Sequence, residues 1–229
     1  MGSFNRLALR TQVRERTGLE SSLYPTDAEI NTCLDASGAE LWGILTTKFT
    51  DIGLTKSAFN IVANQADYSF TTLSTAVTNF FKLRGLDLLV SGSSGYQPMT
   101  KWELEERRLY DRYPNFQAGW PRYVYRLNGD EGFELTPTPP NAGTGRLWYI
   151  RTYTPFIDDT STLNGVNGWE EFVIVDACIK VRAKLDLPID AFMMQKGALM
   201  DRINKEAENL DANKPMRIKQ VRDVDVWPY

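Results

Sequence analysis

Apolar side chains recur at spacings of three, four or seven positions near both ends of the chain, as they do on the buried side of an amphipathic helix. The two repeats consist of Ile30, Leu34, Leu41 and Leu45, and of Leu199, Ile203, Ala207 and Leu210. Residues 172–183 are apolar on nearly every side. The pattern predicts helices from both chain ends that pack as one bundle, with the segment 172–183 inside it.

Local signals mark where these helices begin and end. Gly18 is expected to end a first helix, because glycine tolerates the left-handed conformation that follows many helices. Thr26 and Glu29 have the spacing of a capping box, in which each side chain accepts a hydrogen bond from the other residue's backbone N–H. Pro188 and Asp190 then predict the end of one helix and the N-cap of the last.

The middle of the chain is richer in Thr, Ser, aromatic and β-branched residues, which favour strands. Strands are predicted at residues 57–63, 67–70, 80–90, 122–127, 132–136 and 146–154. Asn128-Gly129-Asp130 predicts a hairpin turn between two of them. One short helix is expected at residues 101–113, and the glycine groups at 92–95 and 143–145 are expected in turns.

These elements predict an α+β fold: a helical bundle from the N- and C-terminal helices, a central, mainly antiparallel β insertion, and an extended C-terminal arm. The expected boundaries are 1–53 for the N-terminal helices, 54–160 for the insertion with its one short helix, 161–212 for the C-terminal helices and 213–229 for the arm.

The arm has no glycine and no helical period, and it contains Pro215 and Pro228. Four basic residues against two acidic ones give it a charge of four minus two, +2, on a chain of net charge -3. Its alternation of polar and β-branched residues suits a strand added to a partner's sheet. The expected contact residues are Arg217, Ile218, Val221, Arg222, Val224, Val226, Trp227 and Tyr229. A disordered tail and an arm folded onto its own domain are the alternatives.

The amino-acid composition excludes several classes of enzyme and argues against some classes of binding protein. The chain has no histidine, which excludes a Ser-His-Asp triad, a Cys-His pair and a zinc site of the HExxH type. Its acidic net charge argues against a surface that wraps nucleic acid. Cys33 and Cys178 both lie in predicted helices, so we expect reduced thiols and synthesis in a reducing cytoplasm. No apolar run approaches the ~20 residues of a membrane span, so no membrane contact is expected.

Two other classes remain as alternatives. A metal-dependent cytoplasmic enzyme would use carboxylate ligands, for which the candidates are Asp158, Asp159, Glu170 and Glu171. A binder of single-stranded nucleic acid would stack bases on aromatic side chains, here Trp120, Tyr123, Tyr125, Trp148, Tyr149 and Tyr153. We expect the acids to be solvated and the aromatics to form core or protein interface, with no catalytic residue, cofactor or metal.

Three arginines form a basic ridge on the first helix. Arg6, Arg10 and Arg14 are spaced four residues apart and therefore share one face. Such a ridge suits the acidic groups of a neighbouring subunit or the phosphates of DNA, and a merely solvated face is the alternative.

Five short motifs follow one another in a recognisable order. They are Val-Arg-Glu-Arg-Thr-Gly at 13–18, Thr-Asp-Ala-Glu-Ile-Asn at 26–31, Gly-Trp-Pro-Arg-Tyr at 119–123, Leu-Thr-Pro-Thr-Pro at 135–139 and Trp-Glu-Glu at 169–171. In this order the chain resembles the head-to-tail connector or portal adaptor proteins of tailed bacteriophages, including the tail tubular protein A type.

The resemblance implies a structural virion protein at the head-tail interface, without catalysis. It implies a homo-oligomeric ring, typically of twelve copies, that binds the portal protein on one side and a tail or nozzle protein on the other. Double-stranded DNA would pass transiently through the channel, without sequence-specific contacts. Synthesis in the cytoplasm of a bacterial host follows from the same resemblance.

Overall fold

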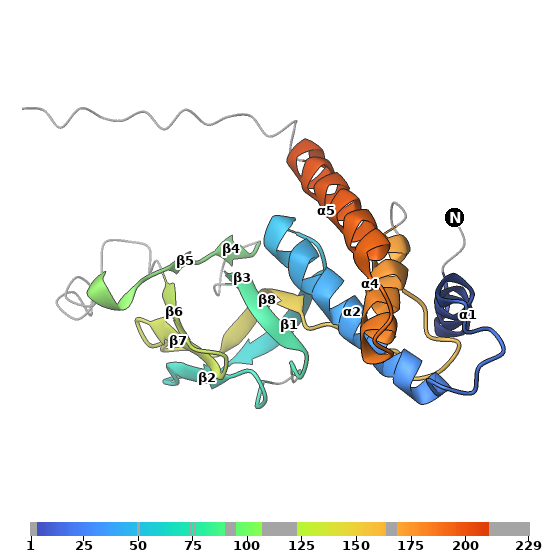
Figure 1. The fold of residues 1–229 in the computed structure, drawn as a ribbon. Helices are drawn as coiled ribbons and strands as arrows, with labels where there is room; N and C mark the ends of the chain where they lie inside the picture. The colour runs from blue at the N-terminus through green and yellow to red at the C-terminus, as the bar shows by residue number, and fades with distance from the viewer. Residues whose placement is uncertain are drawn as a thin grey trace, which may run out of the picture. The chain divides into compact units, whose positions relative to one another are not determined.

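The computed structural model describes residues 4–49, 51–73, 75, 77–89, 95–106, 123–163 and 169–210. The chain divides into two compact units (Figure 1). The helical unit comprises Met1–Leu41 and Phe156–Tyr229, and the β unit comprises Trp42–Pro155. Within the described ranges, four α-helices and two mainly antiparallel sheets confirm the predicted α+β class.

Helix α1 (Arg6–Thr17) has a polar cap at each end. At its start, the Ala8 N–H donates to Asn5 Oδ1 at 2.8 Å. At its end, Gly18 adopts a φ of 73°, and its N–H reaches the carbonyls of Arg14 and Glu15. The predicted helix end at Gly18 is therefore confirmed, because this left-handed conformation costs glycine little.

Helix α2 (Asp27–Lys48) begins at the predicted capping box. The Thr26 N–H donates to Glu29 Oε2 at 2.7 Å, and the Glu29 N–H donates to Thr26 Oγ1 at 3.4 Å. These two bonds confirm the reciprocal cap. The division between the two units falls inside this helix, after Leu41.

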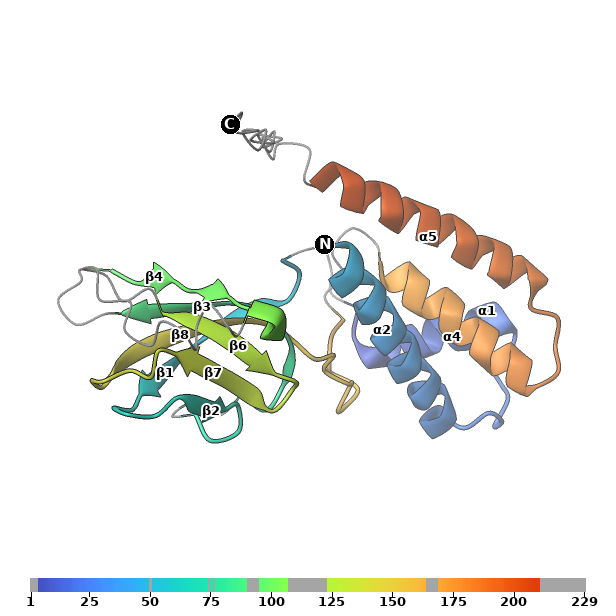
Figure 2. The same cartoon turned by 90° about the vertical axis from the view of Figure 1, so that its left-hand side faces the viewer.

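Helix α4 (Glu170–Lys184) supplies much of the core of the helical unit, and it contacts both α1 and α5 (Asp190–Leu210) (Figure 2). Eight of its residues are buried. The helix ends at Lys184, before Pro188, and Asp186 in the following turn has a φ of 54°. Other buried side chains of this unit are Leu9, Val13, Ile30, Leu34, Leu41, Phe156, Trp169 and Ile203.

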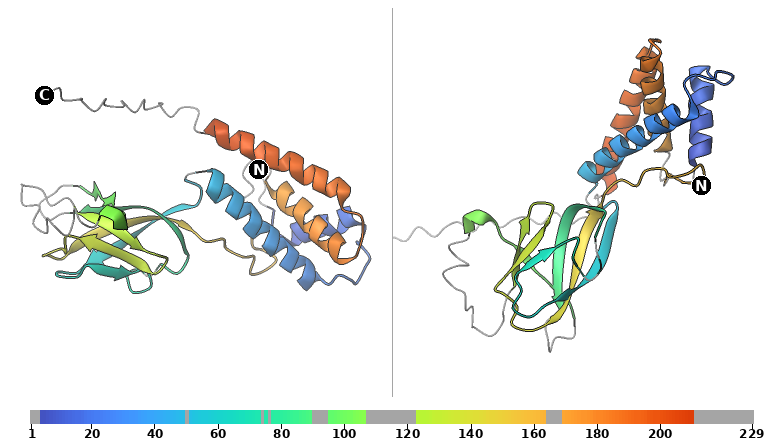
Figure 3. Two further views of the ribbon diagram at one scale, coloured as in Figure 1. Left: turned by 60° about the vertical axis from the view of Figure 1, so that its left-hand side comes forward. Right: turned by 90° about the horizontal axis from the view of Figure 1, so that it is seen from below.

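The β unit contains two four-stranded sheets, ordered β1-β8-β3-β4 and β2-β7-β6-β5. Figure 3 shows the strands of this unit in two further views. All their pairings are antiparallel except that of β5 with β6. The strands are β1 (Leu54–Ile61), β2 (Asp67–Ser69), β3 (Phe80–Leu89), β4 (Gln97–Pro98), β5 (Thr100–Lys101), β6 (Val124–Asn128), β7 (Gly132–Thr136) and β8 (Gly143–Arg151). The predicted hairpin is the β6-β7 pair, with Gly129 at a φ of 62° in its turn.

Aromatic rings fill the core of the β unit. Phe59 lies edge-on to Tyr68 and to Phe133, with ring centroids 5.9 and 5.3 Å apart. A Cβ on Gly145 would lie 2.2 Å from the Phe59 ring, so only glycine fits there. The expectation that residues 143–145 form a turn was therefore wrong: they start β8, where the glycine makes room for an aromatic ring.

The short helix expected at 101–113 does not begin where it was predicted. Lys101 belongs to β5, and the next described element is a single 3-10 turn, Leu104–Glu106. Pairing of Thr100 and Lys101 with β6 overrides the helical preference of the sequence that follows. Residues 107–113 lie outside the described part of the chain. No helix in the described ranges is both long and apolar enough to cross a membrane.

Candidate interaction surfaces

The predicted arm, residues 213–229, lies outside the described residues. Its expected contact residues, from Arg217 to Tyr229, therefore stay a prediction. Trp120 also lies outside the described ranges.

Two arginines of the basic ridge share one carboxylate. Arg6 donates to Asp159 Oδ1 at 3.0 Å through Nε, and Arg10 donates to both carboxylate oxygens at 3.0 and 2.9 Å. Hydrogen bonds from Arg10, and to a smaller extent from Arg6, hold the pKa of Asp159 below its usual value, although burial acts to raise it. The side chains of Arg6 and Arg10 are only 15% and 11% exposed. These contacts tie α1 to the loop that contains Asp159.

Arg14 holds the loop between α1 and α2. Its guanidinium donates to the carbonyl oxygens of Leu19, Ser22 and Pro25 at 3.2, 2.9 and 3.1 Å. It also pairs with Asp27 at 2.7 Å. All three ridge arginines thus have acceptors within the helical unit, and their contact with a neighbouring subunit or with DNA stays a prediction.

Three of the four candidate metal ligands, Asp158, Asp159 and Glu171, have other partners, whereas the buried Oε2 of Glu170 accepts no hydrogen bond from the described residues. Asp158 accepts hydrogen bonds from Thr160 and Ser161, which lower its pKa. Glu171 accepts from both Nη atoms of Arg16, at 2.5 and 2.9 Å. Within the described residues, no group of three or more Cys, Asp or Glu side chains could hold a metal ion.

A buried acid, Asp176, was not identified as a site residue from the sequence, although it interrupts the apolar helix α4. Its side chain is 3% exposed. It accepts a hydrogen bond from Lys180 on its own helix and another, at 2.7 Å, from Lys196 of α5. Both lysines also pair with Glu40 of α2, at 3.3 and 2.6 Å. Two acids and two lysines thus alternate in a closed ion network that joins three helices.

The electrostatics of this network keep Asp176 charged. Burial alone would raise the pKa of Asp176, but hydrogen bonds from Lys180, Lys196 and Ser37 outweigh it and lower the pKa. Burial likewise acts to lower the pKa of Lys196, and the hydrogen bonds to Asp176 and Glu40 raise it above its usual value. The network therefore clamps α5 to the rest of the helical unit.

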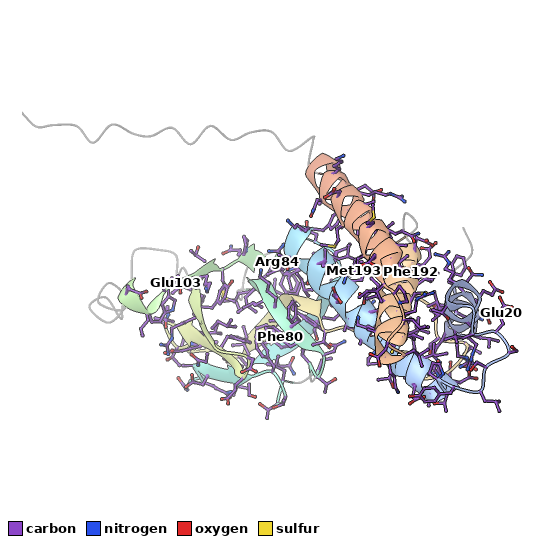
Figure 4. The ribbon with its side chains drawn as sticks, in the orientation of Figure 1. Glu20, Phe80, Arg84, Glu103, Phe192 and Met193 are labelled. Carbon is purple, nitrogen blue, oxygen red and sulfur yellow. The ribbon has the colours of Figure 1, made fainter. Side chains whose placement is uncertain are left out.

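Helix α5 combines these polar contacts with one buried apolar side chain and several half-buried ones. Ile203 is its buried apolar side chain among those described, whereas Met193 and Met194 are 51% and 80% exposed. Figure 4 marks Phe192 and Met193 near the start of the helix. The Arg182 guanidinium lies 5.5 Å from the centre of the Phe192 ring. Helix α5 is thus attached through both apolar and polar positions.

The candidate stacking aromatics are divided between core and surface. Tyr125 and Tyr149 are each 5% exposed and belong to the core of the β unit. Tyr123 packs against that core. Trp148 is half-buried, and its Nε1 donates to Asp87 at 2.6 Å. These four do not form one exposed stacking surface.

Both cysteines are free thiols. Burial raises the pKa of the Cys178 thiol to about 12 and also raises that of Cys33. Neither thiol is activated as a nucleophile, since the thiolate is the reactive form.

Comparison with models of protein families gives one informative match. Residues 5–217 match the family described as SU10 adaptor protein. No curated protein matches the chain. The matched range includes both units and all the helices and strands described above. The chain therefore belongs to the SU10 adaptor protein family of phage head-to-tail adaptors.

Proposed function

We propose that this adaptor forms a closed ring between the portal and the tail or nozzle, and that it completes the DNA channel after packaging. The family match over residues 5–217 carries the proposal. A ring of twelve copies is the expected stoichiometry. Each copy would meet the next through two different surfaces, because head-to-tail contacts generate rings when the rotation closes.

The role is structural rather than catalytic. In the described residues, three of the acids proposed as metal ligands, Asp158, Asp159 and Glu171, bind arginine, hydroxyl or backbone groups, and burial raises the pKa of both thiols. An acidic chain of net charge -3 also suits a channel through which DNA slides without sticking. The protein would reach the virion after synthesis in the host cytoplasm.

We assign the basic ridge of Arg6, Arg10 and Arg14 to the contact between neighbouring copies rather than to DNA. Its guanidinium groups are already paired with Asp159 and Asp27, so little free charge remains to attract phosphates. By fixing the loops around α1, the ridge would shape the surface that the next copy contacts.

The arm at residues 213–229 would dock on the portal. Its +2 charge and its apolar residues, from Ile218 to Tyr229, suit a strand or anchor placed on another protein. The family match ends at residue 217, so the part of the arm beyond it is assigned from composition alone.

Deleting residues 214–229 should abolish stable attachment to purified portal rings, because the proposed anchors are lost together. The melting temperature should stay nearly unchanged, since the deletion spares every described element. Trp227→Ala should weaken attachment, because buried aromatic side chains dominate many interfaces. Co-sedimentation with portal rings, followed by electron microscopy, measures the attachment.

Lys205→Ala is the matched control, because Lys205 is an exposed cation of α5 outside the arm. It should bind like the parent chain. A truncated protein that still forms rings on the portal would contradict the arm assignment, and a parent chain that never associates with portal rings would contradict the proposed function.

A further inference from the structure

The outer face of the β1-β8-β3 sheet carries a compact set of aromatic and charged side chains. Leu147 and Tyr149 of β8 point into the core, so Arg146 and Trp148 lie on the opposite face. Arg146 stands between Ala58 of β1 and Asp87 of β3 in the strand register. The next row on this face contains Lys56, Trp148 and Gly85.

Two contacts hold these side chains in place. The Arg146 guanidinium carbon lies 3.5 Å from the centre of the Tyr96 ring. Trp148 is fixed by its hydrogen bond to Asp87. An arginine stacked on a ring loses less conformational entropy when it binds, because its planar fork is already oriented.

Within the described residues, the Arg146 guanidinium has N–H donors for which no hydrogen bond is found. In the described ranges, no carboxylate or carbonyl oxygen accepts a hydrogen bond from it. By contrast, Arg126 on the other sheet pairs with Glu134 at 2.8 Å. The half-buried Arg146 thus presents its N–H groups to an acceptor outside this part of the chain.

The surroundings favour an acidic partner. Lys56 is exposed, and with Arg146 it outweighs Asp87, which gives the patch a charge of two minus one, +1, on a chain of -3. A Cβ on Gly85 would meet nothing within 4 Å, so the surface beside Trp148 is open. Arg, Trp and Tyr are the residue types most enriched at energetic centres of interfaces.

We propose that Lys56, Asp87, Tyr96, Arg146 and Trp148, called here the Arg146 patch, bind an acidic segment of the tail-side protein. A carboxylate of that segment would accept two N–H groups of Arg146, and an adjoining apolar side chain would cover Trp148. The inference rests on the proposed function: an adaptor joins two partners, and the arm is assigned to the portal from its composition, so the acidic partner of this patch is assigned to the tail side.

The test uses portal-bound rings of the full chain and the purified tail-side protein of the same virion. Arg146→Ala should weaken their association about 30-fold, because the loss of one hot-spot side chain reduces the binding free energy by about 2 kcal/mol. Arg146→Lys keeps the positive charge but lacks the planar guanidinium group, so its affinity should lie between those of the parent and Arg146→Ala. Lys82→Ala removes an exposed cation of β3 as the control and should bind like the parent.

Salt provides a second readout. Association of the parent should weaken as salt rises, and that of Arg146→Ala should depend on salt less, because one ion pair is missing. Equal affinity of the Arg146→Ala variant and the parent for the tail-side protein would overturn the inference while leaving the proposed function intact. If the Arg146→Ala variant lost self-association but still bound the tail-side protein, the inference would also be overturned, and the patch would instead be a contact between copies. A parent chain that does not bind portal rings would instead contradict the proposed function.

Discussion

Asp176→Ala should destabilise the helical unit by about 3–5 kcal/mol, which is typical when one partner of a buried ion pair is removed. The substitution would leave Lys180 and Lys196 facing each other across the space that the carboxylate now occupies. Because Lys196 belongs to α5, the same change should loosen that helix. Urea unfolding followed by circular dichroism gives the free energy, and hydrogen exchange in α5 shows the loosening.

Glu40→Ala is the matched control, since Glu40 pairs with the same two lysines but its side chain is 41% exposed. Exposed pairs contribute little, so a cost of about 1 kcal/mol or less is expected. The double variant Asp176→Ala with Lys196→Ala should cost less than the two single costs added together, because both single changes remove the same contact between Asp176 and Lys196. If Asp176→Ala lowered the free energy of unfolding no more than Glu40→Ala does, the claim that this network holds α5 to the helical unit would be wrong.

Acid gives an independent check on Asp176. Its pKa is lowered in the folded state, so its contribution to stability is fully present above the unfolded pKa of about 3.9 and is lost as the pH falls below that value. The parent chain should therefore lose more stability between neutral and acidic pH than the Asp176→Ala variant does.

Leu34→Ala and Ile174→Ala should each cost about 2–5 kcal/mol, through lost burial and the cavity that remains. Leu34 of α2 is 0% exposed and Ile174 of α4 is 2% exposed, so each substitution removes side-chain atoms from the buried core. The unfolding free energy in urea measures the cost.

Met194→Ala serves as the control for these core variants. Met194 is 80% exposed on α5, and its loss should change stability by no more than about 0.5 kcal/mol. A cost for Leu34→Ala similar to that for Met194→Ala would show that the helical unit lacks the packed core described here.

The helices could be predicted because their signals are local. Thr26 and Glu29 lie within one turn, and Gly18 follows the last turn of α1, so each cap is formed by residues close together in the sequence. The hairpin turn at Gly129 is equally local. Elements of this kind form wherever neighbouring residues supply each other's hydrogen bonds.

The rest depends on contacts that sequence spacing does not reveal. Gly145 lies in a strand because the Phe59 ring occupies its side-chain space. Asp176 was visible as a break in an apolar helix, but its partner Lys196 comes from another helix. The arginine ridge was predicted from its period, whereas its acceptor Asp159 is distant in the sequence. The patch around Arg146 likewise needs the register of three strands.

Cryo-electron microscopy of the intact virion would locate this chain in the particle. We expect a closed ring of the chain between portal and tail, with residues 213–229 of each copy on the portal. Density for the helical and β units at any other place in the particle, or a head-tail junction without this chain, would contradict this expectation.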